Sequence, residues 1–216
     1  MAENAPRIAW VADSALRCEF AARGLMAANR AARELRDAIE AARFDEVEDL
    51  VPGATSLLVL LRPGIDPSSA LLRALEAPLE AASDRPGVAV HEIEVAYGGA
   101  GGPDLADLAR TIGLREREVV AKHVATLYTV GFLGFSPGFA YLLGLPGELH
   151  APRLSTPRTR VPGGSVAIGG AFTGVYPRAT PGGWRILGSA NAALFDPQAE
   201  PASRLRPGDR VRFVAR

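Results

Sequence analysis

The sequence predicts an α+β protein of two domains. Up to residue 97, segments with strand periodicity alternate with segments of helical periodicity. Beyond that residue most apolar segments are short and are separated by glycine or proline. Proline removes a backbone donor and glycine loosens the chain, so this second part is expected to form short strands joined by constrained loops. We expect a small α+β domain in residues 1–92 and a second domain in residues 93–216.

The first domain is predicted to begin with two strands, a helix and a hairpin. Residues 7–20 are expected to form two short strands around a turn at Asp13–Ser14, and residues 24–44 are rich in Ala, Leu, Arg and Glu. Apolar residues at helical spacing form one stripe in the second segment: Leu25, Ala28, Ala32, Leu35 and Ile39. Residues 47–61 resemble a strand that Pro52–Gly53 interrupts, which predicts a hairpin.

A second helix and a final strand complete the predicted first domain. Asp66 or Ser68 can cap a helix that extends to about residue 82, with a kink at Pro78. Residues 88–97 then alternate as a strand. The resulting order β–α–β–β–α–β predicts a ferredoxin-like unit, in which two helices cover one antiparallel sheet.

A glycine cluster, Gly98–Gly102, follows this strand. It lacks the G-K-[ST] ending and the G-x-G-x-x-G spacing of phosphate-binding loops, so we interpret it as a flexible turn between the domains. Two short helices are predicted next, in residues 105–113 and 115–125. The chain ends in a predicted strand over residues 209–216.

Composition argues against several classes of protein. The 216 residues are 48% hydrophobic and carry 24 basic and 24 acidic side chains, so the net charge gives no sign of nucleic-acid or anionic-membrane binding. Cys18 is the sole cysteine and is expected to be a small buried residue. The N-terminal residues do not resemble a signal peptide, and the longest apolar segment, residues 55–61, is too short to span a bilayer. We expect a soluble cytoplasmic protein.

The segment Gly134–Gly138 has the G-x-S-x-G spacing of an esterase nucleophile elbow. In that elbow the residue after the serine donates its N–H to the oxyanion, and an acidic residue and then a histidine follow in the chain. Here that residue is Pro137, which has no N–H, and only His150 follows. We reject the elbow, expect Ser136 to be a turn residue, and assign no catalytic residue.

The three histidines, His91, His123 and His150, are scattered and do not predict a metal site. His123 is the most notable, because it lies just before the strand that enters the aromatic segment. Two roles are open for it: a structural hydrogen bond to a backbone carbonyl, or contact with substrate.

Three arginines, Arg153, Arg158 and Arg160, lie on one loop that contains Pro152, Pro157 and Pro162. Planar guanidinium groups suit carboxylate or phosphate ligands, although any one arginine can equally be solvated or paired within the protein. Because three of them lie on so constrained a loop, anion binding is an equal alternative.

The same part of the chain holds several aromatic residues between glycines and prolines: Phe135, Phe139, Tyr141, Tyr176 and Trp184. The turn Pro181–Gly183 presents Trp184, for which a core position is the alternative to a ligand platform. The glycines of this turn permit close approach by a ligand or a partner.

Taken together, the motifs resemble the 5-oxoprolinase B-subunit family, also called allophanate hydrolase subunit 1, which includes the kinase inhibitor KipI. The resemblance is carried by GF-x-PGF-x-YL, PR-x-x-TPR-x-x-VP-x-GSVAI, TG-x-YP-x-x-x-PGGW, LFDP and RPGDRVRFV between residues 134 and 214. It is also carried by YGG-x-x-GPDL from Tyr97 and by H-x-x-x-x-Y-x-V from His123. The match is dense over residues 92–216 and looser before them.

The resemblance implies a fold and an activity. It implies a cyclophilin-like β-barrel for the second domain and a small α+β domain for the first. The B subunit of this family works with two partners, the homologous C subunit together with the A subunit, and the complex hydrolyses 5-oxoproline to glutamate with ATP. ATP would therefore be used at the level of the complex, and the chain alone is expected to be inactive.

The resemblance also implies functional residues. It matches the positions of His123, Arg153, Arg158 and Tyr176, for which we expect a substrate-binding groove. Because aromatic residues are favoured anchors of interfaces, we also expect a hydrophobic partner-binding surface on the barrel near Phe135, Phe139 and Trp184.

Two alternatives and two departures accompany this interpretation. KipI inhibits a histidine kinase, and related domains occur in urea carboxylase, so a regulatory protein or a component of an allophanate hydrolase or urea carboxylase system is an alternative. The family that the chain resembles usually has an acidic residue at the position of Ala100 and often has an arginine at the position of Ser189.

Overall fold

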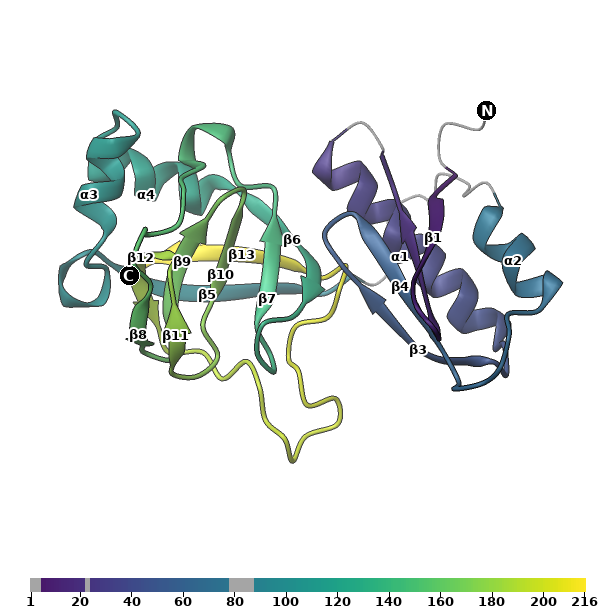
Figure 1. Cartoon of the computed structure of the whole chain (residues 1–216). Helices are drawn as coiled ribbons and strands as arrows, with labels where there is room; N and C mark the ends of the chain where they lie inside the picture. Colours follow the sequence, from purple (N-terminus) through teal and green to yellow (C-terminus); the bar gives the residue numbers. More distant parts are fainter. Residues whose placement is uncertain (1–4, 22–23, 78–87) are drawn as a thin grey trace. The chain divides into compact units, whose positions relative to one another are not determined.

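The computed structural model describes residues 5–21, 24–77 and 88–216, and the chain divides into two units, Met1–Gly87 and Val88–Arg216 (Figure 1). Each unit has its own hydrophobic core.

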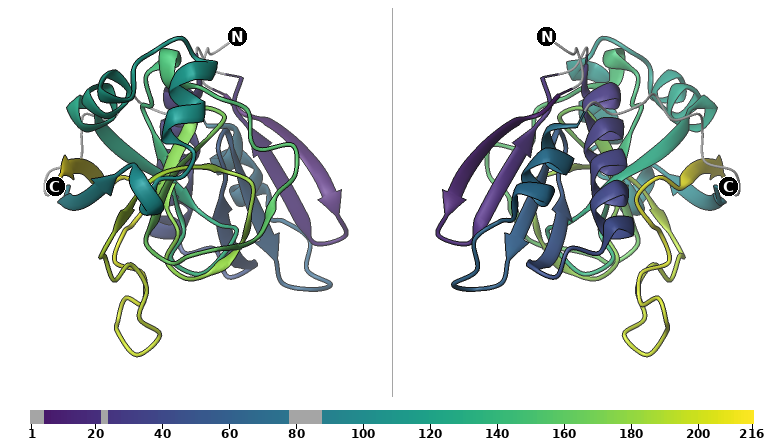
Figure 2. Two further views of the ribbon diagram at one scale, coloured as in Figure 1. Left: turned by 90° about the vertical axis from the view of Figure 1, so that its left-hand side faces the viewer. Right: turned by 90° about the vertical axis from the view of Figure 1, so that its right-hand side faces the viewer.

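The first unit is an antiparallel sheet with two helices (Figures 1 and 2). Its strands are β1 (Arg7–Ala12), β2 (Ala15–Glu19), β3 (Val47–Pro52) and β4 (Ser56–Leu61), in the order β1-β2-β4-β3. Helices α1 (Leu25–Ala42) and α2 (Ser69–Glu76) share one core with the sheet. Residues of both helices and of the two central strands contribute to it: Ala32, Leu35, Ile39, Leu71, Leu75, Leu16, Cys18, Leu57 and Val59.

Several local predictions for this unit are confirmed. The helix and the hairpin form where expected, and Ser68 is the cap of α2, because its Oγ accepts the Leu71 N–H at 3.1 Å. Cys18 is buried, and burial raises the pKa of its thiol to about 11. Helix α2 ends at Glu76, so the last part of the predicted helix, with Pro78, lies outside the described residues.

The structure does not confirm the ferredoxin-like unit. The strand expected to complete it, β5 (Val90–Tyr97), pairs with strands of the second unit instead. Its buried residues Ile93 and Val95 belong to the core of that unit. Alternation along a strand predicts which side chains face a core but says nothing about which sheet the strand joins, and that is why the prediction failed here.

The second unit is a closed barrel with the strand order β10-β7-β6-β13-β5-β12-β9. After β5 these strands are β6 (Leu127–Leu133), β7 (Ala140–Leu143), β9 (Ser165–Gly169), β10 (Phe172–Val175), β12 (Arg185–Ala190) and β13 (Arg210–Ala215). Strand β13 runs parallel to β5 and antiparallel to β6, so the last strand lies between the first two. The predicted barrel and the predicted final strand are thus both present.

Shorter elements surround the barrel. Strands β8 (Arg158–Val161) and β11 (Thr180–Gly182) form a separate two-stranded ribbon. Helices α3 (Leu105–Thr111) and α4 (Glu116–Ala125) are the two predicted after the glycine cluster, and 3-10 turns η1 (Gly99–Gly101) and η2 (Gly147–Leu149) complete the unit. Within the described residues, no helix is both long and apolar enough to cross a membrane.

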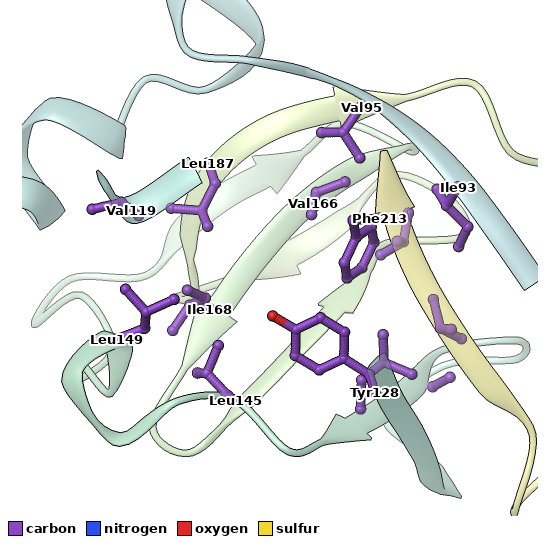
Figure 3. Packing of buried hydrophobic residues seen from close by; sticks show 14 of the residues in the cluster. Ile93, Val95, Val119, Tyr128, Leu145, Leu149, Val166, Ile168, Leu187 and Phe213 are labelled. Atoms are coloured by element: carbon purple, nitrogen blue, oxygen red, sulfur yellow. The ribbon is translucent and has the colours of Figure 1, made fainter. Parts of the chain in front are cut away.

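The barrel core is apolar and contains aromatic residues (Figure 3). Tyr128 and Phe213 lie edge to face there, with ring centroids 5.5 Å apart, and Val166, Ile168 and Leu187 belong to the same cluster. Tyr128 is buried, and its hydroxyl donates to the His123 carbonyl at 2.9 Å, so its polar end is satisfied inside the core.

The glycine cluster is not the flexible turn between domains that we predicted. It lies within the second unit, where Gly98 N–H donates to the Leu187 carbonyl at 2.9 Å and Asp104 N–H donates to the Ile186 carbonyl at 3.0 Å. Gly102 packs directly on the backbone of β12, since a Cβ there would come within 2.1 Å of the Leu187 oxygen. Glycine is required here by close packing of two backbones.

This packing predicts the effect of Gly102→Ala. The new methyl group would displace backbone atoms, and we expect the free energy of unfolding to fall by about 2 kcal/mol or more, in the range of other overpacked sites. Gly147→Ala is the matched control, because a Cβ at Gly147 would meet nothing within 4 Å. Urea denaturation of both variants measures the difference, and equal midpoints for the two would contradict the packing argument.

Candidate functional site

Three neighbouring barrel strands bury side chains on both faces. Leu142 of β7 and Val166 of β9 belong to the barrel core, whereas Tyr141 and Ala167, the adjacent residues, belong to a second cluster. Because interior and exterior residues alternate along barrel strands, the second cluster lies on the outer face of the wall. We call it the outer aromatic cluster, and its members are Phe139, Tyr141, Val161, Ala167, Phe172, Tyr176, Trp184 and Ile186.

Phe139 is the centre of this cluster. Its ring meets those of Tyr141, Tyr176 and Trp184 edge to face, at centroid distances of 5.1, 5.2 and 5.3 Å. Trp184 lies against the bare backbone of β9, since a Cβ on Gly169 would come within 2.6 Å of its ring carbons. Edge-to-face contacts of this kind add to the free energy of burial, so the cluster is a second small core.

The three residues predicted to bind a partner differ in exposure. Phe139 and Trp184 are only 1% and 4% exposed, so they support the surface from below. Phe135 is 59% exposed, and its ring touches Phe139 and Tyr176 edge to face at 5.4 and 6.2 Å. Of the three, only Phe135 can offer a partner a large apolar surface.

A strained turn holds Phe135 in this position. Its φ angle is 68°, which is unusual for a residue other than glycine, and Ser136 N–H donates to the Gly134 carbonyl at 2.8 Å across it. The Phe139 N–H closes the loop by donating to the Ser136 carbonyl at 3.0 Å. The G-x-S-x-G segment is therefore a tight turn, as predicted for Ser136, and strain of this kind is often found at functional positions.

Two of the predicted arginines lie at the edge of the outer aromatic cluster. Arg158 Nη2 donates to Asp104 Oδ1 at 2.6 Å, and Asp104 Oδ2 accepts the Ile186 N–H at 2.7 Å. The Arg153 guanidinium lies over Trp184, 5.9 Å from the ring centroid. Asp104 was missed as a site residue, because in the sequence it is only the residue that precedes a helix.

Tyr176 connects the two arginines to the cluster. Burial raises the pKa of Tyr176, while the Trp184 backbone N–H and the charges of Arg153 and Arg158 oppose that rise. Both positive charges are therefore close enough to influence the same phenol. The structure thus brings together Arg153, Arg158 and Tyr176 of the predicted groove, whereas Arg160 is an exposed residue of β8.

His123 does not join them, because it is fully buried with the barrel core. Its Nδ1 lies 2.6 Å from the Tyr97 hydroxyl and its Nε2 lies 2.9 Å from Thr173 Oγ1. Thr173 donates its own proton to the Ala167 carbonyl at 3.0 Å, so Nε2 carries the imidazole proton and Nδ1 accepts from Tyr97. Of the two roles left open for His123 this is the structural one, although its ring partners are hydroxyl groups and not a carbonyl.

The two departures from the family pattern lie next to each other in space. Gly101, adjacent to Ala100, packs against the side chain of Ser189. The acidic residue and the arginine that the family usually has would thus fall in the same part of the barrel. Among the described residues, no group of three or more His, Cys, Asp or Glu side chains could hold a metal ion.

The buried His123 predicts a pH dependence of stability. Burial lowers its pKa from 6.5 to about 3, so between these values the unfolded chain binds a proton that the folded chain does not. This contribution is fully present above pH 6.5 and declines as the pH falls, by about 1.4 kcal/mol per pH unit. Urea denaturation between pH 7.5 and 4.5 should show a shallower decline for His123→Gln than for the wild type. Parallel curves would contradict the assignment.

Comparison with known proteins agrees with this architecture. Residues 6–205 match the family described as carboxyltransferase domain, subdomain C and D. The chain is 49% identical over 172 residues to a 5-oxoprolinase B subunit of Escherichia coli O157:H7, covering 78% of each chain. It superimposes on the crystal structure of TTHA0988 with a TM-score of 0.80 and 38% identity, covering 94% of this chain and 40% of that one.

One further structure supports the fold alone. The K. lactis urea amidolyase aligns with a TM-score of 0.81 over 100% of this chain and 15% of its own length, at 16% identity. The chain thus spans less than half the length of TTHA0988 and a small part of the amidolyase. With the family match over most of its residues and a close relative over 78% of them, the chain belongs to the 5-oxoprolinase B-subunit family of carboxyltransferase-type domains.

Proposed function

We propose that the chain is the B subunit of a 5-oxoprolinase-type complex, which acts in the cytoplasm and hydrolyses 5-oxoproline to glutamate with ATP. The observation that carries this proposal is the 49% identity, over 78% of each chain, to a protein named as the B subunit of 5-oxoprolinase. We further propose that its closed barrel is of the cyclophilin-like type and that the A and C subunits complete the active complex.

The polar groups of the barrel support the proposal that the chain needs partners for catalysis. Ser136 Oγ is buried and has no hydrogen-bond partner in the described part of the chain, so no base activates it. His123 is neutral, buried and engaged at both nitrogens. Catalysis by general acid and base requires a group within reach of the substrate, and these two groups do not supply one.

Phe135 is the best candidate contact for the C subunit. It is a large exposed apolar side chain on a strained turn, and buried aromatic rings support it from below. Aromatic residues of this kind often dominate the binding energy of protein interfaces, because they bury a large area with little loss of freedom.

A second candidate function is a role in urea or allophanate metabolism. The matching family is described as a carboxyltransferase domain, and this description favours a carboxylated substrate over the regulatory role of KipI. The reconstitution below separates it from the main proposal, because urea and 5-oxoproline can be offered to the same complex.

We expect the purified chain alone to show no ATP hydrolysis that depends on 5-oxoproline. Adding the A and C subunits should produce that hydrolysis together with glutamate, because the partners are expected to supply the missing catalytic groups. Phosphate release and glutamate formation are measured for the chain alone, for the two partners without it, and for all three proteins. Equal turnover with and without this chain would contradict the proposal, as would robust turnover by the chain alone.

We expect Phe135→Ala to weaken the affinity for the C subunit, with a loss of about 2 kcal/mol or more, the usual effect of truncating a central aromatic contact. Thermal stability should not fall, because the ring is mostly exposed and the substitution removes little buried area. Leu127→Ala is the control, as it truncates an exposed apolar residue at the start of the strand that leads to the Phe135 turn. Calorimetric titration with the C subunit that gives the same affinity for both variants would exclude Phe135 as an anchor.

A further inference from the structure

Arg158 has more hydrogen-bond donors than the protein uses. Its Nη2 donates to Asp104, whereas its Nη1 is buried and has no acceptor among the described residues. A guanidinium group carries five N–H donors, and a buried charged donor without an acceptor is unfavourable. Arg158 is therefore only partly satisfied within the protein. An oxygen atom supplied by a ligand would relieve this cost.

Asp104 fixes the position of this arginine. One carboxylate oxygen accepts from Arg158 at 2.6 Å, and the other accepts from the Ile186 backbone N–H at 2.7 Å. The Asp104 side chain is only 10% exposed, and its backbone N–H is also bonded to β12. Asp104 therefore holds Arg158 at one nitrogen and leaves the other terminal nitrogen without an acceptor among the described residues. It also neutralises the charge of Arg158.

Arg153 supplies the positive charge that is not neutralised. Its side chain is exposed and lies over the Trp184 ring, and within the described residues no carboxylate is at ion-pair distance from it. Two acidic residues of this part of the barrel are already paired: Asp104 binds Arg158, and Asp107 binds Arg185 and Arg110. Arg153, Arg158 and Asp104, taken together, thus carry one net positive charge at the edge of the cluster.

This combination determines the class of ligand. Hydrogen-bond donors with a net positive charge select an anion, and planar guanidinium groups match the two oxygens of a carboxylate. The exposed ring of Phe135 and the half-buried ring of Tyr141 offer apolar contacts to the body of a small ligand.

We propose that Arg153 and Arg158 bind the carboxylate of a small cyclic amino acid derivative, 5-oxoproline, at the edge of the outer aromatic cluster. The identity of the ligand rests on the proposed function, whereas the carboxylate site itself rests on the two arginines. His123 plays no part in this site, because the barrel wall buries it on the opposite face of β10.

The test begins with direct binding to the full-length chain. Isothermal titration calorimetry with 5-oxoproline is compared with 2-pyrrolidinone, the same lactam ring without the carboxylate. We expect 5-oxoproline to bind and 2-pyrrolidinone not to bind, and we expect Arg153→Gln and Arg158→Lys each to weaken binding at least tenfold. Arg160→Gln, at an exposed arginine of the same loop, is the matched control and should bind as the wild type does.

The same variants are then tested in the complex with the A and C subunits. Arg153→Gln should raise KM for 5-oxoproline at least tenfold with little change in kcat, since it removes a binding contact that chemistry does not use. Arg153 forms no ion pair within the described residues, so this variant keeps the test valid even if Arg158→Lys fails to fold. A raised KM supports the site even where the isolated chain binds too weakly for calorimetry.

Each failure has a distinct signature. Normal turnover with unchanged KM in both arginine variants overturns the site and leaves the proposed function standing. A complex without turnover, combined with arginine-dependent binding of 5-oxoproline, retains the site and overturns the proposed function. Arginine-dependent binding of inorganic phosphate alone overturns the carboxylate assignment. A short peptide with a free C-terminus can also be tested. If it binds as tightly as 5-oxoproline, and if both depend on the arginines, the site recognises a carboxylate but its ligand is the C-terminus of a partner chain.

Discussion

The barrel wall formed by β7, β9 and β10 must bury side chains on both of its faces, and the rest of the second unit depends on this constraint. On the inner face, branched aliphatic residues such as Val166 and Ile168 fill the barrel. On the outer face small residues are needed, since Ala167 and Gly169 leave room for Trp184 to lie on the strand. A strand that is buried on both sides does not alternate between polar and apolar residues. The three strands of this wall accordingly consist mostly of apolar residues and glycine.

Two polar groups beside this wall differ in how fully they are satisfied. On the inner side, His123 has a partner at each ring nitrogen, and a complete network of this kind rigidifies a core. On the outer side, Arg158 has a strong partner at Nη2 and none in the described residues at Nη1. Buried polar groups in folded proteins are nearly always bonded, so an exception at a surface lined with aromatic rings indicates function more strongly than a satisfied group does.

Local sequence signals predicted most of the elements. The apolar stripe of α1, the break at Pro52–Gly53 and the cap at Ser68 each act within a few residues, and each forms as expected. Pairing between distant strands was not predicted, because Val90–Tyr97 has the same alternation whichever sheet it joins. The glycine cluster misled for a related reason: glycine marks both flexible turns and tight packing, and only the neighbouring backbone of β12 distinguishes them.

The candidate site was predicted in part. The prolines around Arg153 and Arg158 correctly indicated a constrained loop near aromatic residues, and Tyr176 lies with them. His123 was grouped with them because the family resemblance matches its position, yet it lies on α4, and its ring bonds to Thr173 on the inner face of the barrel wall. The role of Asp104 depends on a contact with Arg158 across 54 residues, which no local pattern reveals.

The place of β13 between β5 and β6 has a consequence for how the protein forms on the ribosome. Arg210 pairs with Val90, so the barrel cannot close until β13 has been synthesised. Contacts between residues so far apart in sequence form slowly, because the intervening loop must be ordered first. During that interval β5 and β6 expose unpaired edges, which are templates for aggregation. The nascent barrel is therefore most vulnerable to aggregation just before β13 is synthesised, because only β13 covers the free edges of β5 and β6.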